Sequence, residues 1–163
     1  EDDRPRLLTV RERRLKDWIF VTGGWRRREI YNPLRCALRE LEEETRGVVS
    51  LKKGEYTEFS FIHRESPTVE LVYNVYVFFV NYKRTDQQQL IKKFNDEKTK
   101  TNLKKINKEP IKKTYDENDF MSFDTLEEFN TRKRWDLIVH NVIQNPEFYS
   151  CVTSLNRKTF SIK

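Results

Sequence analysis

The chain has 163 residues and a formal net charge of +6; 36% of its residues are hydrophobic, 36% are charged, and only 4 are Gly and 5 are Pro. This length suits one ordinary domain with a real core, and the composition excludes collagen-like, low-complexity and largely disordered proteins. The excess of Lys and Arg favours a polyanionic partner such as RNA, DNA, a nucleotide or an inositol phosphate, although a biased surface composition would produce the same excess.

The sequence favours neither a membrane protein nor a disulfide-stabilised secreted one. Its longest apolar run, VYVFFV at 75–80, is far too short to cross a bilayer. The two cysteines, Cys36 and Cys151, do not make a disulfide framework, and unpaired cysteines are the rule inside cells. We therefore expect a cytoplasmic protein with no membrane partner.

The first third of the chain predicts strands around one helix. Residues 7–13 read as a strand, and the β-rich run at 17–25 ends in a glycine pair. A helix is predicted from 33 to 45, because Asn32 is a good N-cap, Pro33 fits the first helical position and Gly47 lies just past the end. A short strand is expected at 47–53.

The rest of the chain predicts two strands, a polar insertion and a final helix. Residues 57–64 alternate as a strand, and residues 69–82 are apolar on both faces, as in a central strand covered on either side. Residues 83–114 read as a polar, partly helical or mobile insertion, in which QQQLIKKF is the only helix-like patch. Residues 118–129 predict a strand and then a turn, and 131–145 an amphipathic helix. This order predicts an α+β fold.

The predicted helix at 33–45 carries an unusual group of acids. On a helical wheel its core face is followed by a second arc that holds Glu40, Glu43 and Glu44. Three carboxylates on one arc offer the oxygen ligands that Mg²⁺ or Mn²⁺ prefers. A solvated acidic face would show the same pattern. The core face consists of Leu34, Ala37, Leu38 and Leu41.

The residues before and within this helix resemble the Nudix box, G-x5-E-x7-R-E-U-x-E-E-x-G-U, where U is a large aliphatic residue. Gly23 and Glu29 match its first half, and the run from Arg39 to Glu44 matches R-E-U-x-E-E. Nine residues separate Glu29 from Arg39, where the family has seven. Either the loop is two residues longer, or Tyr31 occupies the position of the usual Glu.

Two further positions depart from the family pattern. Arg46 stands where the last Gly is expected, with Gly47 one place later, and Thr22 stands where many members have Pro. The first of these departures should alter only the exit from the helix. The strand, glycine loop and capped helix are otherwise the context that the box requires.

The resemblance implies an α/β/α sandwich around a mixed β-sheet, formed by residues 1–163 as a single domain. It also implies hydrolysis of a nucleoside diphosphate linked to another group, with Mg²⁺ or Mn²⁺ as cofactor. By transfer, Glu40, Glu43 and Glu44 bind the metals, and the carbonyl of Gly23 is a further candidate ligand. Gly24, Glu29 and Arg39 are the structural residues of the box.

One carboxylate must also accept a proton during hydrolysis. Within the catalytic set, which also includes Glu43, Glu44 is the first candidate for this role. Glu117 and Asp119 are the alternatives, since Nudix enzymes often recruit the base from a later loop, although both could be ordinary surface acids.

The substrate is less well indicated than the chemistry. Arg26, Arg27 and Arg28 precede the helix and could clamp phosphates, while Trp25 and Tyr31 beside them could stack on a base. The Lys-rich stretch at 92–113 could follow an RNA backbone, and a solvated charge run is the alternative for each basic segment. Together these features resemble the decapping branch of Nudix enzymes and, more weakly, Nudix proteins of large DNA viruses.

A capped RNA is therefore the leading expected substrate, cleaved to 7-methylguanosine diphosphate and RNA with a 5′-monophosphate. A small polyphosphate such as diphosphoinositol polyphosphate, ADP-ribose or a dinucleoside polyphosphate is the second expectation. A non-catalytic binding or scaffold module is the third, but such domains typically lose the carboxylates that this chain keeps.

Overall fold

The computed structural model describes residues 4–24, 26–52 and 56–155, with side chains as far as residue 152. The chain divides into two compact units: unit 1 comprises residues 1–52 and 82–135, and unit 2 comprises residues 53–81 and 136–163. Both units combine helices with antiparallel strands, which confirms the predicted α+β class. Of the helices described, none is both long and apolar enough to cross a membrane.

Unit 1 is built on a three-stranded sheet of order β2-β1-β5, formed by β2 (Trp18–Ile19), β1 (Leu7–Glu12) and β5 (Asn118–Asp124). Both pairings are antiparallel, and Val10 pairs with Ile19 on one side and Met121 on the other. Within the described residues the only parallel pairing is an isolated bridge between Trp18 and Arg134, so the expected mixed sheet is mixed through that bridge alone. A short helix, α3 (Leu126–Asn130), follows β5.

One face of this sheet carries the core of unit 1. Because alternate residues of a strand point to the same face, Val10 of β1 lies with Met121 and Phe123 of β5. Two helices, α1 (Pro33–Glu44) and α2 (Arg84–Ile106), bring further apolar residues to the same cluster. The buried members are Val10, Val49, Phe94, Met121 and Phe123, with Leu8, Ile19, Leu41, Val48, Leu90 and Ile91 half-buried against them.

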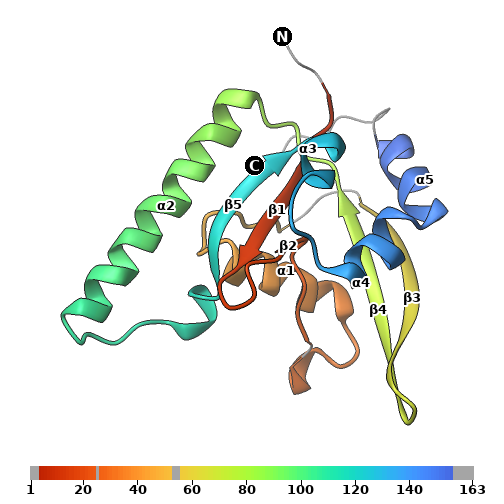
Figure 1. The fold of residues 1–163 in the computed structure, drawn as a ribbon, viewed down its shortest axis with the longest axis horizontal. Coiled ribbons are helices and arrows are strands. Elements are labelled where there is room, and N and C mark those ends of the chain that lie inside the picture. Colours follow the sequence, from red (N-terminus) through yellow and green to blue (C-terminus); the bar gives the residue numbers. More distant parts are fainter. Residues whose placement is uncertain (1–3, 25, 53–55, 156–163) are drawn as a thin grey trace. The chain divides into compact units, whose positions relative to one another are not determined.

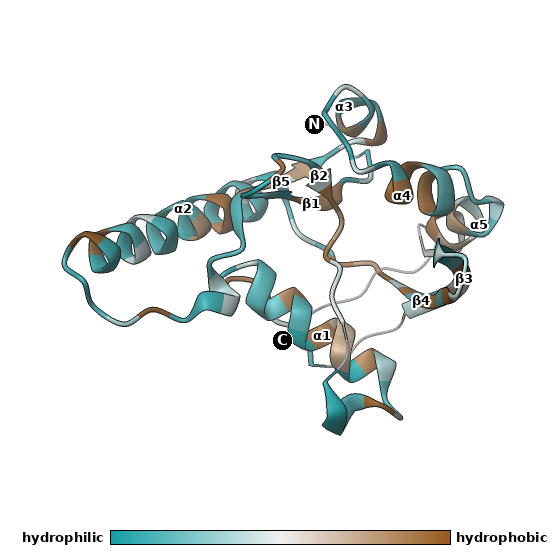
Figure 2. Ribbon diagram, turned by 60° about the horizontal axis from the view of Figure 1, so that its bottom comes forward, coloured by the Kyte–Doolittle hydropathy of each residue, from teal (hydrophilic) through white to brown (hydrophobic). Residues whose placement is uncertain are grey.

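Helix α2 corrects the expected polar insertion at 83–114, because it is one continuous helix of 23 residues. Phe94 is fully buried and ties its N-terminal half to the sheet. The C-terminal half runs on past the sheet in both views (Figures 1 and 2), and there Leu103 and Ile106 are 54% and 74% exposed. Most of α2 is hydrophilic (Figure 2), so the spacing of its few apolar residues is a weak signal of a helix in the sequence. A 3-10 turn, η2 (Lys113–Tyr115), leads into β5.

The strand predicted at 47–53 is absent over residues 47–52, the part of it that the structure describes. Thr45 holds this segment in a tight exit from α1, since its hydroxyl donates to Leu41 O at 2.7 Å and accepts from Val49 N–H at 3.1 Å. Gly47 has a φ of +77°, which glycine adopts without strain. Val48 and Val49, the β-branched residues of this segment, therefore pack against the core from a loop rather than from a strand.

Unit 2 contains a β-hairpin of β3 (Tyr56–Ser66) and β4 (Val69–Phe78). The predicted alternation of β3 is confirmed, because Phe59 is buried and Phe61 stacks on Tyr73 with ring centroids 4.9 Å apart. The prediction of a central strand at 69–82 was wrong: in the described residues β4 pairs with β3 alone, and its first half is exposed. Aromatic contacts with β3 account for Tyr73, Tyr76 and Phe78 of β4, whereas its residues Val69, Leu71 and Val72 are exposed.

The helix predicted at 131–145 was also wrong in its bounds. Helix α4 (Asp136–Ile138) starts later and continues as a π-helical turn, η3 (Val139–Ile143), and α5 (Pro146–Leu155) follows. Pro146 separates the two, because its ring occupies the first position of a new helix. Helix α5 packs against β3 within unit 2.

We predict that Phe94→Ala lowers the free energy of unfolding by about 3–5 kcal/mol, because it leaves a cavity in the core of unit 1. Leu103→Ala on the same helix is the matched control and should change it by less than about 0.5 kcal/mol, because that side chain is largely exposed. Urea unfolding followed by circular dichroism measures both. Equal, small effects would mean that α2 is not part of the folded core.

Candidate active site

Helix α1 begins as its sequence predicts. The side chain of Asn32 accepts a hydrogen bond from Arg35 N–H at 3.1 Å, and Pro33 occupies the first position. A short 3-10 turn, η1 (Arg27–Glu29), precedes it. Of the predicted core face, Leu41 packs against the core cluster, while Leu34 and Leu38 are half-buried.

Arg39 and Glu29 form a nearly buried, forked ion pair that joins α1 to the preceding loop. Arg39 Nε lies 2.8 Å from Glu29 Oε2, and Nη2 lies 3.0 Å from Oε1. Hydrogen bonds from Arg39 lower the pKa of Glu29 to about 2, and those same bonds raise the pKa of Arg39. The loop is therefore two residues longer than the family pattern and still makes the pair. Tyr31 does not replace Glu29, since it is 95% exposed.

The same guanidinium reaches the acids of the helix. Arg39 Nη1 donates to Glu40 Oε1 at 2.8 Å and to Glu43 Oε2 at 3.0 Å, and Nη2 donates to the carbonyl of Gly24 at 2.9 Å. Arg26 donates to the other oxygen of Glu43 at 2.8 Å. Arginine charge thus offsets the repulsion that the crowded carboxylates would otherwise create.

Gly23 allows the loop to approach Glu40 closely. A Cβ placed on Gly23 would lie 1.9 Å from Glu40 Cδ, so the Glu40 carboxylate would have to move from the position in which it binds Arg39. Glycine at this position therefore lets Glu40 keep that position beside the loop. A Cβ placed on the neighbouring Gly24 would meet open space. Gly24 contributes its backbone carbonyl, which accepts a hydrogen bond from Arg39.

Glu44 is the least compensated of the three acids. It is 5% exposed, and its Oε2 accepts one hydrogen bond, a long one of 3.4 Å from Thr22 N–H. Burial, and then the charge of Glu40, raise the pKa of Glu44 to about 8. Burial likewise raises the pKa of Glu40, although Arg39 opposes the shift. A proline in place of Thr22 would have no N–H to donate, so this departure from the family pattern gives Glu44 its partner.

The two later acids differ sharply. Glu117 faces the cluster: burial and the charge of Glu43 raise its pKa, and its own charge raises the pKa of Glu44. Asp119 is held by Arg11 at 2.8 Å and by Lys16 at 2.6 Å. Although burial alone would raise it, hydrogen bonds from these two cations lower the pKa of Asp119 to about 2. Of the two, Glu117 is the better proton acceptor.

Arg46 explains how Glu117 reaches the cluster. This residue has a φ of +57° at the exit of α1, and its side chain is 3% exposed. It donates to Asp116 Oδ1 at 3.1 Å and to the carbonyl of Asn118 at 2.7 Å, on either side of Glu117. Asn118 in turn donates to the carbonyl of Glu44 at 3.1 Å. The Arg that replaces the family's Gly therefore fixes the start of β5 against the end of α1.

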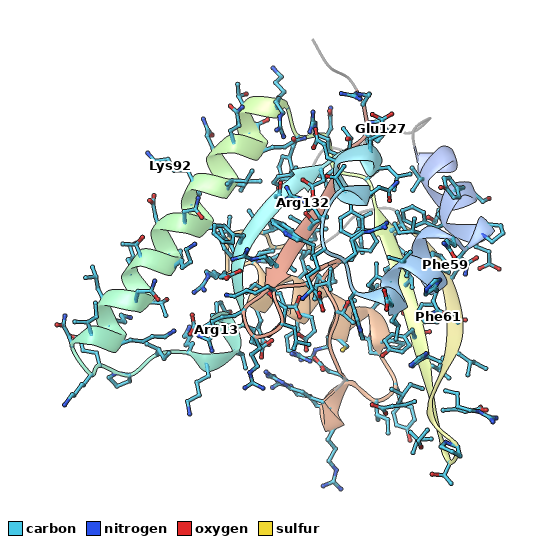
Figure 3. The ribbon with its side chains drawn as sticks, in the orientation of Figure 1. Arg13, Phe59, Phe61, Lys92, Glu127 and Arg132 are labelled. Carbon is cyan, nitrogen blue, oxygen red and sulfur yellow. The ribbon has the colours of Figure 1, made fainter. Side chains whose placement is uncertain are left out.

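A pocket of about 540 Å³ lies at this junction in unit 1. Glu44 and Glu117 line it together with four cations, Arg13, Arg14, Lys105 and Lys113. Figure 3 shows Arg13 in the turn after β1, close to the segment that enters β5. The cations come from that turn, from the end of α2 and from η2, so three separate segments meet beside the acidic helix.

Of the residues predicted to bind substrate, those that the structure describes do not line this pocket. Arg26 is engaged by Glu43, Arg27 and Arg28 are exposed on η1 and do not line the pocket, and Trp25 lies outside the described residues. Sequence reasoning missed Arg13 and Arg14. It expected Arg46 to alter only the exit from the helix, whereas Arg46 also binds Asp116 and the carbonyl of Asn118. The pairing of Glu12 with Asn118 brings Arg13 to the pocket, and no local pattern encodes that pairing.

The geometry defines a hydrolase-type site in which a braced acidic helix borders a cationic pocket. A family model described as NUDIX domain matches residues 1–134, so the chain belongs to the Nudix family. It is a Nudix hydrolase, an enzyme that acts on the pyrophosphate bonds of nucleoside diphosphate derivatives. No curated protein and no solved structure gives a significant match.

Nudix hydrolases typically need divalent metal ions. Within the described residues no group of three His, Cys, Asp or Glu side chains is arranged to hold one; here Arg39 and Arg26 bind oxygens of Glu40 and Glu43. The donors still fit such an ion, because all are oxygens and because Glu44 is buried without an ion pair in the part of the chain described. Glu40, Glu43 and Glu44 are the residues that would hold it.

We predict that Glu29→Gln lowers the free energy of unfolding by about 3–5 kcal/mol at pH 7, because it leaves Arg39 without its buried partner. The pKa of Glu29 in the folded protein, about 2, lies below the ordinary value of 4.5, so the Glu29 contribution is complete above about pH 4.5 and is lost as the pH falls toward 2. The difference between wild type and variant should therefore shrink over this range.

Urea unfolding at pH 7, 5 and 3.5 tests this expectation. Glu97→Gln is the control, since Glu97 makes an exposed pair with Lys100 and should change stability by less than about 1 kcal/mol at any pH. A stability difference for Glu29→Gln that stays constant with pH would contradict the assignment.

Proposed function

We propose that this Nudix hydrolase removes the 5′ cap of RNA, releasing 7-methylguanosine diphosphate and leaving a 5′-monophosphate end. One observation carries the proposal: the pocket that Glu44 lines adjoins the end of a long basic helix, because Lys105 in the last turn of α2 also lines the pocket. A substrate with a diphosphate and a long anionic body matches that combination.

The basic character of this region is concentrated. Residues 84–113 hold ten Lys and Arg and four Asp and Glu, an excess that equals the net charge of +6 of the whole chain. Figure 3 shows Lys92 pointing outward from α2, and Lys93 and Lys104 are also exposed. Exposed lysines of this kind bind a phosphate backbone without reading its sequence.

The chemical step would use the acids of α1. A divalent ion held by Glu40, Glu43 and Glu44 would supply charge that offsets the diphosphate and favours attack by water. Glu117 lines the same pocket, and its raised pKa makes it a stronger base than an ordinary carboxylate. Glu44 and Glu43 remain alternatives for this role in the proposed mechanism.

A small, highly phosphorylated substrate is the second candidate, and the pocket lining favours it. Among the described residues the lining contains four cations and no aromatic side chain, whereas recognition of a base commonly uses an aromatic stacking partner. A diphosphoinositol polyphosphate would need the cations and would not need the long helix.

We predict that Glu43→Gln/Glu44→Gln lowers kcat by at least about 100-fold, because it removes ligand charge and one candidate base. The assay compares capped RNA, cap dinucleotide, diphosphoinositol polyphosphate, ADP-ribose and a dinucleoside tetraphosphate, each with Mg²⁺, Mn²⁺ or a chelator. Glu97→Gln serves as the matched control. If wild type turns over none of these substrates with either metal, the proposed function is wrong.

We also predict that Lys92→Gln/Lys93→Gln/Lys104→Gln weakens binding of capped RNA and leaves hydrolysis of cap dinucleotide unchanged. Loss of three phosphate contacts should flatten the dependence of log K on log salt by about 2. Substitution is preferable to deletion of residues 92–113, because deletion would remove the buried Phe94. Equal activity of wild type on capped RNA and on free cap dinucleotide would show that α2 does not hold the RNA body.

A further inference from the structure

The cations of the pocket are arranged around one buried acid. Asp116 is 3% exposed and pairs with Arg13 Nη1, Lys105 Nζ and Arg46 Nη2, at 2.5, 2.5 and 3.1 Å. One carboxylate cannot neutralise three cations, so this cluster, of which Asp116, Arg13 and Lys105 line the pocket, keeps an excess of positive charge.

Two further cations line the same pocket without such a partner. Within the described residues neither Arg14 nor Lys113 makes an ion pair or a side-chain hydrogen bond, and both are exposed. The charge of Arg14 acts on the nearby Glu117, whose pKa it lowers. The turn that carries Arg14 is nevertheless well defined, because the carboxylate of Glu12 accepts from Arg14 N–H at 2.8 Å and from Leu15 N–H at 2.6 Å. Glu12 is thereby occupied in holding the turn.

The acids of the pocket divide by task. Glu44 and Glu117 belong to the acidic end, where the charge of Glu117 raises the pKa of Glu44. Asp116 and Glu12 are taken up by structural contacts. A ligand held at the acidic end therefore has Arg14 and Lys113 as its available partners in the rest of the pocket.

We infer that Arg14 and Lys113, supported by Arg13 and Lys105, form a subsite for a further phosphate of the substrate, beyond the two that share the hydrolysed bond. Guanidinium and ammonium groups are the side chains that bind phosphate oxygens, and the pocket volume of about 540 Å³ suits a small ligand. The inference rests on the proposed pyrophosphohydrolase function and narrows its substrates to those with three or more phosphates close together. Both a linear triphosphate bridge and phosphates on a ring meet this requirement.

The first test is direct binding, which does not depend on turnover. Isothermal calorimetry of the full chain in a chelator measures inorganic tripolyphosphate, pyrophosphate and inositol hexakisphosphate. Wild type should bind at least one of the two larger ligands more tightly than pyrophosphate. Arg14→Gln/Lys113→Gln should weaken that binding at least about tenfold and pyrophosphate binding by less than about threefold. Which larger ligand binds more tightly distinguishes the linear from the ring-borne source.

The matched control is Lys52→Gln/Arg64→Gln, which removes the same charge from two exposed residues outside the pocket and should change binding by less than twofold. Arg14→Lys keeps the charge and should retain most of the affinity. Thermal unfolding of every variant should match wild type, since the substituted side chains are exposed. A double variant that binds tripolyphosphate and hexakisphosphate as wild type does would overturn the subsite, as would wild type that prefers neither to pyrophosphate.

Kinetics separate this inference from the proposed function. For cap dinucleotide the double variant should raise KM at least about tenfold with kcat within twofold, whereas KM for ADP-ribose, with two phosphates, should change little. Binding that depends on Arg14 and Lys113, with no turnover of any substrate, would support the subsite and overturn the proposed function. Turnover with unchanged KM in the double variant would overturn the subsite and leave the function standing.

Discussion

The site depends on the contacts of one guanidinium. Arg39 binds Glu29, Glu40, Glu43 and the carbonyl of Gly24, so it both holds the loop and offsets the charge of the helix. Without it, carboxylates one turn apart would repel one another in a partly buried place, where water screens them poorly. Its fork geometry explains why the longer loop does not matter: the two extra residues lie between Glu29 and Arg39, and Glu29 still meets two nitrogens of the guanidinium.

A second arginine does comparable work at the other end of α1. Arg46 binds Asp116 and the carbonyl of Asn118, so the start of β5 is tied to the helix and Glu117 is brought to the acidic cluster. The same Asp116 collects Arg13 and Lys105. One residue that departs from the family pattern thus connects the acidic end of the pocket with its cationic part.

The sequence predicted α1 well because its signals are local: Asn32, Pro33 and the acids lie within one short run. Through the resemblance it named Glu29 and Arg39 as structural residues but left open whether Tyr31 stands in place of the usual Glu. It could not predict the pocket, because Arg13 and Glu117 are brought together by pairing between β1 and β5. Helix α2 was underestimated since Leu90, Ile91 and Phe94 are its few core residues among polar ones. The strand expected at 47–53 does not form over the described residues 47–52, because the Thr45 hydroxyl gives the backbone N–H of Val49 a local hydrogen-bond partner.

The charges of the three acids of α1 are compensated to different degrees, and the least compensated acid is the one that lines the pocket. Glu43 is bound by two arginines and Glu40 by one, while Glu44 makes no ion pair with a described residue and is stabilised by the distant N–H of Thr22 and by the side chain of Asn118. Glu44 is also the one of the three that lines the pocket. A cation that enters from the pocket therefore binds most favourably at Glu44, because the buried charge of Glu44 is the least compensated of the three. It can bind there without first breaking the Arg39–Glu29 pair. The loop can thus stay braced whether or not the acidic end is filled.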